Sequence, residues 1–237
     1  MMATLPVVRP PTNDTEERLL DAALTLFAEK GYEAASVREI IEAAGVTRPV
    51  LYYYCASKED LFKRLVHWKH DKAYRELGRI AKEAAGWADR LRAIMRGSFA
   101  FCAADPRVPR LMFQTAYGPS IPGISEFMAE LGGLRFGIVR RVMQDGIAAG
   151  EVRGRAASSL ALIFCCLMDQ HLNVYSRMPN PRACLTAELA DDLVNVFLHG
   201  VAAGTPPSPP SRNRRPQLQG PLQAVVGQSR AASRRPK

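Results

Sequence analysis

Two short helical patterns separated by a glycine turn constrain the fold of this chain more than any other feature. Residues 36–39 read S-V-R-E, a capping box in which the two end side chains satisfy free backbone N–H groups. Gly45 then ends the helix, because glycine readily adopts the positive φ of a helix C-terminus. Thr47 follows as the next N-cap, and Pro49 stands in the first turn, where its missing N–H costs nothing. This spacing is typical of a helix-turn-helix unit.

A further helix precedes this pair. Its pattern begins at Asp14, which is expected to form a capping pair with Glu17, and ends at Gly31. The pair is expected to leave the start of its second helix, Arg48 to Tyr54, exposed. Free N–H groups at such a helix start attract phosphate, and the helix fits the major groove of B-DNA.

The chain of 237 residues has no alternating apolar pattern long enough for a strand, so the sequence predicts an all-α fold. We expect a flexible arm at residues 1–13, three short helices in 14–57, and longer helices in 58–202. Residues 203–237 are expected to be a disordered, basic, Pro-rich tail, because they offer little that could form a core. The longer helices are placed at about 58–83, 88–103, 107–117, 124–149, 155–176 and 184–201.

The net charge of +9 belongs mostly to the tail. Residues 204–237 carry basic but no acidic side chains and supply +7, which leaves the rest of the chain nearly neutral. Two interpretations of the tail remain open. It is either an inert end or a segment that adds salt-sensitive attraction to DNA.

A membrane or secretory role has little support. The longest apolar run, Ala156–Met168, is shorter than the roughly 20 residues of a membrane-spanning helix, so we expect a buried helix there. The N-terminus lacks a long apolar region after a basic start, and five cysteines do not make a disulfide framework. We therefore expect no secretory signal and a location in the reducing cytoplasm.

Several motifs between Glu16 and Leu65 occur in a specific order: A-x-x-L-F-x-x-x-G-Y, S-V-R-E-I, A-G-V-T, L-Y-Y-Y and S-K-E-D-L. With these motifs the stretch resembles the DNA-binding domain of the TetR/AcrR family of bacterial transcription regulators. The resemblance implies an N-terminal three-helix helix-turn-helix domain followed by a larger helical ligand-binding and dimerisation domain. Beyond residue 65 the assignment depends on the layout of the helices alone.

The resemblance also assigns DNA contacts to individual residues. Thr47 matches a position that caps the recognition helix and touches phosphate. Arg48 matches one that reaches base edges, where an arginine can bind guanine O6 and N7 bidentately; a solvated charge is the alternative. Lys58 matches a phosphate-contacting lysine. Ser36 and Arg38 lie where the preceding helix approaches the DNA backbone.

Three tyrosines follow the exposed helix start. Tyr52 and Tyr53 match backbone or groove contacts, and Tyr54 stands where the family often has a phosphate-binding histidine. Tyr52 could instead be a half-buried aromatic residue with its hydroxyl at the rim of the core. A helix–helix interface is a further alternative for all three, but their position directly after the helix start favours DNA contact.

The recognition helix departs from the family pattern at three positions. Pro49 and Val50 stand where Gly and Thr are common, so they join the expected DNA-contacting residues and predict an unusual base preference. Cys55 replaces a core phenylalanine, so the end of this helix is expected to pack differently.

The longer helices are expected to enclose a ligand cavity. Aromatic and polar side chains that could line it are Trp68, Phe99, Phe113, Gln114, Tyr117, Phe127, Phe136, Gln170, His171 and Tyr175. Core packing is the alternative for each of them. Gln170 and His171 are polar within an apolar helix, so they lie either beside a ligand or on a surface turn. The mixture predicts a mostly apolar or aromatic small-molecule effector.

The last two helices are the most apolar of the chain. In the family the corresponding helices form a four-helix bundle with a second subunit, so the resemblance implies a homodimer. The interface residues expected from the apolar pattern are Leu160, Phe164, Leu167, Leu189, Leu193 and Phe197. A core within one monomer is the alternative.

Other chemistry has little support in the sequence. His67 and His70 are spaced for a metal, but no set of cysteines or carboxylates joins them. Cys165 and Cys166 are expected to pack as small, buried apolar residues. Residues 118–122 miss the nucleophile-elbow pattern, and no Gly-rich phosphate loop follows a strand. We therefore expect no enzymatic activity, metal or cofactor.

The sequence thus predicts a sequence-specific DNA-binding transcriptional regulator that associates with the nucleoid when bound. A homodimer would place two recognition helices in successive major grooves of a pseudo-palindromic operator. Release by a small effector would make it a repressor, and an activator is the alternative. Two other classes remain open: a non-specific chromosome-organising protein, and a small-molecule carrier or enzyme that keeps the helix-turn-helix only as a fold element.

Overall fold

The computed structural model describes residues 10–83, 86–152 and 155–200. Throughout these ranges the secondary structure is helical, with no strand, so the prediction of an all-α fold is confirmed. Most of the predicted arm and all of the predicted tail lie outside the described residues.

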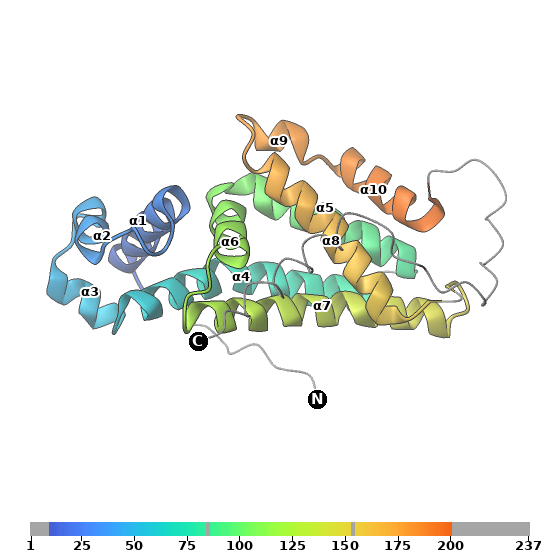
Figure 1. Ribbon diagram of the computed structural model, residues 1–237, viewed down its shortest axis with the longest axis horizontal. Helices are drawn as coiled ribbons and strands as arrows, with labels where there is room; N and C mark the ends of the chain where they lie inside the picture. The colour runs from blue at the N-terminus through green and yellow to red at the C-terminus, as the bar shows by residue number, and fades with distance from the viewer. Residues whose placement is uncertain (1–9, 84–85, 153–154, 201–237) are drawn as a thin grey trace, which may run out of the picture. The chain divides into compact units, whose positions relative to one another are not determined.

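The three predicted short helices are present as α1 (Asp14–Lys30), α2 (Val37–Ala44) and α3 (Arg48–Tyr54) (Figure 1). The capping box of α2 is confirmed. Ser36 Oγ accepts a hydrogen bond from the Glu39 N–H at 3.2 Å, and Glu39 Oε2 accepts one from the Ser36 N–H at 2.9 Å. The turn after α2 requires glycine, since Gly45 has a φ of 63° in the left-handed region.

Two predicted caps differ from the structure. Helix α1 is capped by Asn13, whose Oδ1 accepts from the Glu16 N–H at 3.0 Å, and not by Asp14. Thr47 occupies the N-cap position of α3, but its hydroxyl makes no capping hydrogen bond. Pro49 explains this loss in part, because it removes one of the two N–H groups that an N-cap side chain can reach.

The longer helices follow the predicted order, and only the last prediction needs correction. They are α4 (Lys58–Glu83), α5 (Trp87–Ala104), α6 (Arg107–Tyr117), α7 (Ile124–Ala148), α8 (Ala157–Tyr175), α9 (Pro181–Cys184) and α10 (Ala187–His199). The last predicted helix, at 184–201, is in fact α10 preceded by the separate short helix α9. Thr186 separates the two, because its side chain caps α10 by accepting from the Leu189 N–H at 3.2 Å.

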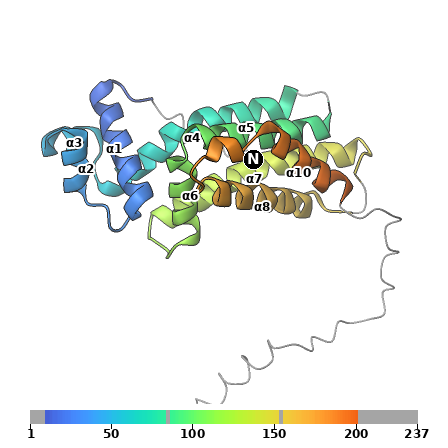
Figure 2. The same cartoon turned by 90° about the horizontal axis from the view of Figure 1, so that it is seen from above.

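Helix α4 runs from the three short helices into the bundle formed by the longer ones (Figures 1 and 2). Its first half packs with α1–α3 in one hydrophobic cluster, and Leu77 near its end belongs to a second cluster. The first cluster also contains Leu111 of α6 and Phe127 of α7. The short helices therefore share a core with α6 and α7, and the domain boundary at residue 57 stays a prediction from the sequence.

A buried ion pair fixes the start of α1 against α4. Glu16 is fully buried, and its carboxylate pairs with Arg64 of α4. The same carboxylate accepts hydrogen bonds from the Thr12 N–H at 2.7 Å and the Thr12 hydroxyl at 2.8 Å. Burial by itself would raise the pKa of Glu16, but these hydrogen bonds and the Arg64 charge lower it below its ordinary value.

The expectation that the apolar run of α8 is a buried helix is wrong for one face. Phe164 and Met168 lie in the second cluster, whereas Leu162, Ile163 and Val174 are exposed. The helix is long and apolar enough to cross a membrane by length and composition alone, with 28% of its apolar window buried. Helix α8 carries apolar side chains on all of its faces, so the sequence does not distinguish its buried face from its exposed face.

Candidate functional site

Helix α3 presents an exposed surface of aromatic and basic side chains. It buries only Leu51 completely, while Arg48 and Tyr52 are exposed and the Tyr53 side chain has 82% of its surface accessible. The Arg48 guanidinium carbon lies 5.7 Å from the centre of the Tyr52 ring, close enough for a cation–π contact. These side chains are free to contact a groove of DNA, and the half-buried alternative for Tyr52 is not what the structure shows.

Tyr54 and Lys58 already have partners inside the protein. The Tyr54 hydroxyl bonds with the side chain of Asn13, with an O···Nδ2 distance of 2.8 Å. Lys58 Nζ donates to the Glu33 carbonyl oxygen at 3.1 Å and lies 4.5 Å from the centre of the Tyr32 ring. Burial lowers the pKa of Lys58. Both side chains hold the three-helix unit together, so their expected phosphate contacts would require exchange of these bonds.

The remaining residues predicted to contact DNA lie at the starts of α2 and α3. Ser36 is exposed, and its hydroxyl donates to Glu39 Oε2 at 2.7 Å. Arg38 is exposed and pairs with Glu42 one turn later at 2.8 Å. Thr47 and Pro49 are exposed as well. The side chain of Val50 is half-buried.

A carboxylate that the sequence analysis used only as a cap has a second role. Glu39 pairs with Lys30 at 2.6 Å, which links α2 to the end of α1. The hydrogen bonds from Lys30 and from Ser36 lower the pKa of Glu39 to about 2. The capping box therefore stays charged and intact throughout the neutral range.

A partly open cavity of about 370 Å³ lies among the longer helices, lined by residues of α4, α5, α6, α7 and α8. Its volume is in the range of small-molecule sites. The apolar part of its wall includes Leu77, Ile80, Phe101, Met112, Phe113 and Met128. Of the residues predicted to line a cavity, Phe113 and Tyr117 do so, and their rings stack with centres 5.9 Å apart.

The other residues predicted to line the cavity lie elsewhere. The second cluster or its margin holds Phe99, Phe136 and Tyr175, and the first cluster or its margin holds Phe127 and Trp68. Gln170 is exposed on the outer face of α8, and His171 Nδ1 lies 2.7 Å from a carbonyl oxygen of its own helix. Gln114 has a buried Oε1 without a hydrogen-bond partner but does not line the cavity.

The polar part of the cavity wall was missed by the sequence analysis. It contains His70 and Tyr74 of α4, Arg135 of α7 and Asp169 of α8. Arg135 Nη2 donates to Asp169 Oδ2 at 2.5 Å, and the Tyr74 hydroxyl donates to a backbone carbonyl of α7 at 3.2 Å. The one available signal was Asp169, a charged residue inside the predicted helix 155–176, which was interpreted only as the end of the apolar run.

The predicted dimer residues divide between core and surface. Phe164 is fully buried and packs edge-on against Phe197 with ring centres 5.4 Å apart, so its assignment to an interface is wrong. The other five are half-buried: Leu160, Leu167, Leu189, Leu193 and Phe197. The exposed apolar side chains on these two helices are instead Leu162, Ile163, Val174 and Val196.

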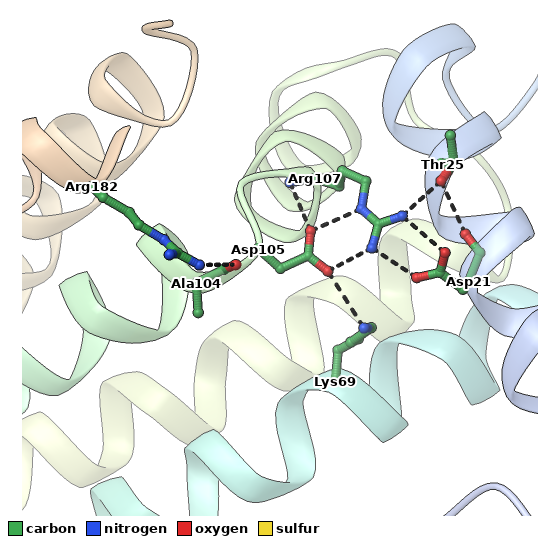
Figure 3. A network of polar contacts seen from close by, with 7 residues as sticks. All are labelled: Asp21, Thr25, Lys69, Ala104, Asp105, Arg107 and Arg182. Carbon is green, nitrogen blue, oxygen red and sulfur yellow. Dashed lines mark hydrogen bonds and ion pairs between the residues drawn. The ribbon is translucent and has the colours of Figure 1, made fainter. Parts of the chain in front are cut away.

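A polar network joins α1 to the longer helices (Figure 3). Arg107, at the start of α6, donates from Nη2 to Asp21 Oδ1 of α1 at 2.7 Å and from Nη1 to Thr25 Oγ1 at 2.8 Å. Arg107 Nε also donates to Asp105 Oδ1 at 2.9 Å, and Lys69 of α4 approaches Asp105 Oδ2 at 3.4 Å. Arg107 and Asp105 thus link α1, α4 and α6 in one network.

The metal and cysteine predictions have different outcomes. Within the described part of the chain, no group of three or more His, Cys, Asp or Glu side chains is placed to hold a metal ion. Cys165 is buried as predicted, and burial raises the pKa of its thiol to about 11. Cys166 is exposed, so its predicted burial is wrong.

The comparison with known sequences agrees with this arrangement. Residues 19–65, which cover α2, α3 and most of α1, match the family described as bacterial regulatory proteins, tetR family. The segment that contains α2 and α3 therefore matches the TetR family.

Two curated relatives have regulatory names. The HTH-type transcriptional activator FasR of Mycolicibacterium smegmatis is 32% identical over 109 residues, which are 46% of this chain and 50% of FasR. The HTH-type transcriptional repressor KstR2 of Rhodococcus jostii is 26% identical over 205 residues, which cover 82% of this chain and 97% of KstR2. The match with FasR thus spans only half of that protein.

A solved TetR-like structure shares the fold of the longer helices as well. The transcriptional regulator FadR from Bacillus subtilis, in complex with stearoyl-CoA, superposes with a TM-score of 0.69 at 21% identity. The match covers 78% of this chain and 99% of FadR. The likeness in fold therefore extends beyond the matched N-terminal segment to the helices around the cavity.

Proposed function

We propose that this protein is a sequence-specific transcriptional regulator that binds DNA as a homodimer and is released by a mostly apolar effector. The observation that carries the proposal is the combination in one chain of an exposed Arg48–Tyr52–Tyr53 surface and a mostly apolar cavity among the longer helices. A chromosome-organising role would not explain the cavity, and a carrier role would not explain the exposed surface of α3.

The surface of α3 supports recognition of double-stranded DNA. An exposed arginine at the start of a recognition helix can bind guanine bidentately, and exposed tyrosines beside it can contact the sugar–phosphate backbone. Arg48 and Tyr53 have no hydrogen-bond or ion-pair partner among the described residues, so binding of DNA would break no such internal bond of theirs.

The outer faces of α8 and α10 support a homodimer. Leu162, Ile163 and Val174 form an exposed apolar stripe on α8, and Val196 is exposed on α10. An apolar stripe of this kind favours burial against a second copy around a two-fold axis. Two copies would present two α3 helices, which matches a pseudo-palindromic operator.

The cavity supports a mostly apolar effector. Its wall is largely aromatic and aliphatic, and two of its charged side chains, Arg135 and Asp169, neutralise each other. The FadR structure was solved with stearoyl-CoA, so fatty acyl thioesters are the first compounds to test. The location that fits this function is the bacterial cytoplasm.

The effector would act through the helices that the cavity and the DNA-binding unit share. Helices α4 and α6 line the cavity, and both contact α1 through the first hydrophobic cluster and the Arg107 network. A ligand that favours one placement of α4 and α6 would shift α1, and with it the separation of two α3 helices. We propose release from DNA, hence repression. The relatives FasR and KstR2 are named activator and repressor, so the sign is decided by experiment.

The decisive experiment is a binding selection. Purified protein is mixed with random and genomic DNA fragments at near-physiological salt, and the bound pool is sequenced. A pseudo-palindrome in that pool supports the proposal and supplies the operator for effector screens. Uniform recovery of all fragments would indicate a non-specific DNA-binding protein, and no recovery would indicate a carrier or enzyme that does not bind DNA.

A further inference from the structure

An ion pair forms one wall of the cavity. Arg135 of α7 and Asp169 of α8 are deeply enclosed by the packed helices, yet their side chains keep 25% and 15% of their surface accessible. Both residues line the cavity. The two opposite charges cancel, and the pair therefore offers polar contacts in an apolar cavity without net charge.

The pair is incompletely satisfied. Arg135 Nη2 and Asp169 Oδ2 are bonded to each other, but the donor Arg135 Nε and the acceptor Asp169 Oδ1 have no hydrogen-bond partner. Buried polar atoms are nearly always paired in native proteins, and an unpaired one opposes folding. An unpaired donor and an unpaired acceptor on the same ion pair indicate that a further group completes the site.

A third polar atom lies on the same cavity wall. His70 of α4 has an Nε2 without a hydrogen-bond partner. Burial, with the nearby Arg135 charge, lowers the pKa of His70 to about 3, so the imidazole is neutral under ordinary conditions. The Tyr74 hydroxyl is already bonded to a backbone carbonyl of α7. Glu76 and Ser98 also line the cavity, but the buried polar atoms of its wall that lack a partner belong to one carboxylate, one guanidinium and one neutral imidazole.

The chemistry of these three groups selects the ligand. A hydrocarbon would leave all of them unpaired, and a carboxylate would only accept hydrogen bonds and would meet the charge of Asp169. A hydroxyl both donates and accepts, so it can donate to Asp169 Oδ1 and accept from Arg135. Hydrogen bonds to charged groups are also stronger than those between neutral groups.

We propose that the cavity takes a mainly apolar molecule bearing an uncharged hydroxyl, which binds between Asp169 and Arg135. This inference rests on the proposed function, because the molecule is the effector of that regulator. The apolar body would pack against Leu77, Met112 and Phe113, which belong to the apolar part of the cavity wall. An ordered water can also bridge such a pair, and the experiment below separates a water from a ligand hydroxyl.

Three probes of similar shape test the hydroxyl. Displacement of the fluorescent dye N-phenylnaphthylamine is measured with para-butylphenol, butylbenzene and para-butylbenzoate on the full chain. We expect para-butylphenol to bind about 10-fold more tightly than butylbenzene, the factor that a hydrogen bond to a charged group supplies. Para-butylbenzoate should bind most weakly. Equal affinities for all three would overturn the hydroxyl proposal and leave an apolar effector site intact.

Matched variants locate the preference. Arg135→Lys keeps the positive charge but removes Nε, and the double variant Arg135→Met with Asp169→Leu replaces the pair by apolar side chains of similar volume. Both variants should bring the ratio of the affinities for para-butylphenol and butylbenzene close to 1. Arg140→Met, an exposed change on the same helix, should preserve that ratio. A preference that survives in both variants would place the hydroxyl elsewhere and overturn the proposal.

A cavity-filling variant separates this proposal from the proposed function. Met112→Trp should abolish dye displacement by every probe, because Met112 lines the cavity. Binding that persists in Met112→Trp would show that the probes bind at another site and would overturn the proposal. If the dye never binds the unchanged protein and no probe alters DNA binding, the effector part of the proposed function fails as well. Circular dichroism confirms that each variant is folded.

Discussion

Arg107 of α6 and Asp21 of α1 form a bidentate ion pair between the DNA-binding unit and the helices around the cavity. The distances are 2.7 Å from Nη2 to Oδ1 and 3.1 Å from Nη1 to Oδ2. The same guanidinium contacts Asp105 and Thr25, so every nitrogen of Arg107 has a partner (Figure 3). Burial by itself would raise the pKa of Asp105, but its bonds to Arg107 and the charges of Arg107 and Lys69 lower it.

Arg107→Lys tests whether this pair transmits a signal. Lysine keeps the charge but cannot bond two carboxylates in a fork, so we expect the free energy of unfolding to fall by about 1 kcal/mol. Any change in operator affinity caused by para-butylphenol should also become smaller. Urea denaturation and fluorescence anisotropy measure the two effects. Arg110→Lys, on the same helix, is the control, and an equal loss in both variants would rule out a special role for Arg107.

Arg48→Ala tests base recognition by α3. Loss of a bidentate contact should weaken binding to the selected operator by about 1–3 kcal/mol and relax the sequence preference at one position of each half-site. Anisotropy titrations with operator variants measure both effects. Arg141→Ala removes an exposed arginine of α7 and should leave affinity unchanged. Equal weakening on all sequences would instead assign Arg48 to phosphate contact.

Ile163→Glu tests the proposed dimer face. The Ile163 side chain has 51% of its surface exposed, so a glutamate is tolerated in the monomer. In a dimer the same carboxylate would be buried in an apolar interface without a partner, which is strongly unfavourable. We expect sedimentation velocity to show a monomer at micromolar concentration. Ala43→Glu, an exposed change on α2, should stay dimeric, and a dimer in both variants would place the interface elsewhere.

His70→Gln tests the burial of a neutral imidazole. In the unfolded chain the imidazole takes up a proton below about pH 6.5, whereas burial holds the folded pKa at about 3. Between these values the unfolded state binds more protons, so the free energy of unfolding falls as the pH falls, by at most about 1.4 kcal/mol per pH unit.

The comparison is made by urea denaturation at about pH 7 and about pH 5. The Gln variant should lose less stability over this interval than the unchanged protein. His199→Gln removes an exposed histidine at the end of α10 and serves as the control. An identical pH dependence in all three proteins would show that His70 is not held neutral by burial.

Gly146→Ala tests packing between α7 and α5. A Cβ at this position would lie 2.8 Å from Cδ2 of Trp87, closer than real contacts allow, so the variant should be less stable by about 1–3 kcal/mol. Gly133→Ala is the matched change in the same helix. A Cβ there meets nothing within 4 Å, and the variant should gain about 0.5–1 kcal/mol from helix propensity. Thermal unfolding should therefore show a lower stability for Gly146→Ala and a higher stability for Gly133→Ala than for the unchanged protein.

The sequence predicted the helices well because caps and turns are local. Ser36 and Gly45 each act within a few residues, so their neighbours in sequence reveal their role. The predicted N-cap of α1 failed by one residue, because Asn13 and Asp14 both favour that position and only the backbone angles distinguish them. The exposed residues of α3 were predicted from the TetR resemblance, which depends on the order of several motifs as well as on the residue types.

The cavity could not be predicted in the same way. Aromatic side chains suit a core and a ligand equally, so hydrophobicity found Phe113 and Tyr117 but also selected Phe99 and Phe127, which pack in the core. His70 was considered only with His67 as a metal pair. Its position on the cavity wall depends on where α5 and α7 pack against α4.

The amino-acid sequence by itself determined the helical elements, their order and the recognition surface of α3, because each depends on residues within a few turns of one another. Only the tertiary structure decided which polar groups face the cavity and which face of α8 is left exposed. Arg135 and Asp169 are 34 residues apart, and their pairing requires α7 and α8 to pack side by side. No local pattern encodes that contact, because it arises from the free energy of burying both helices against the rest of the bundle.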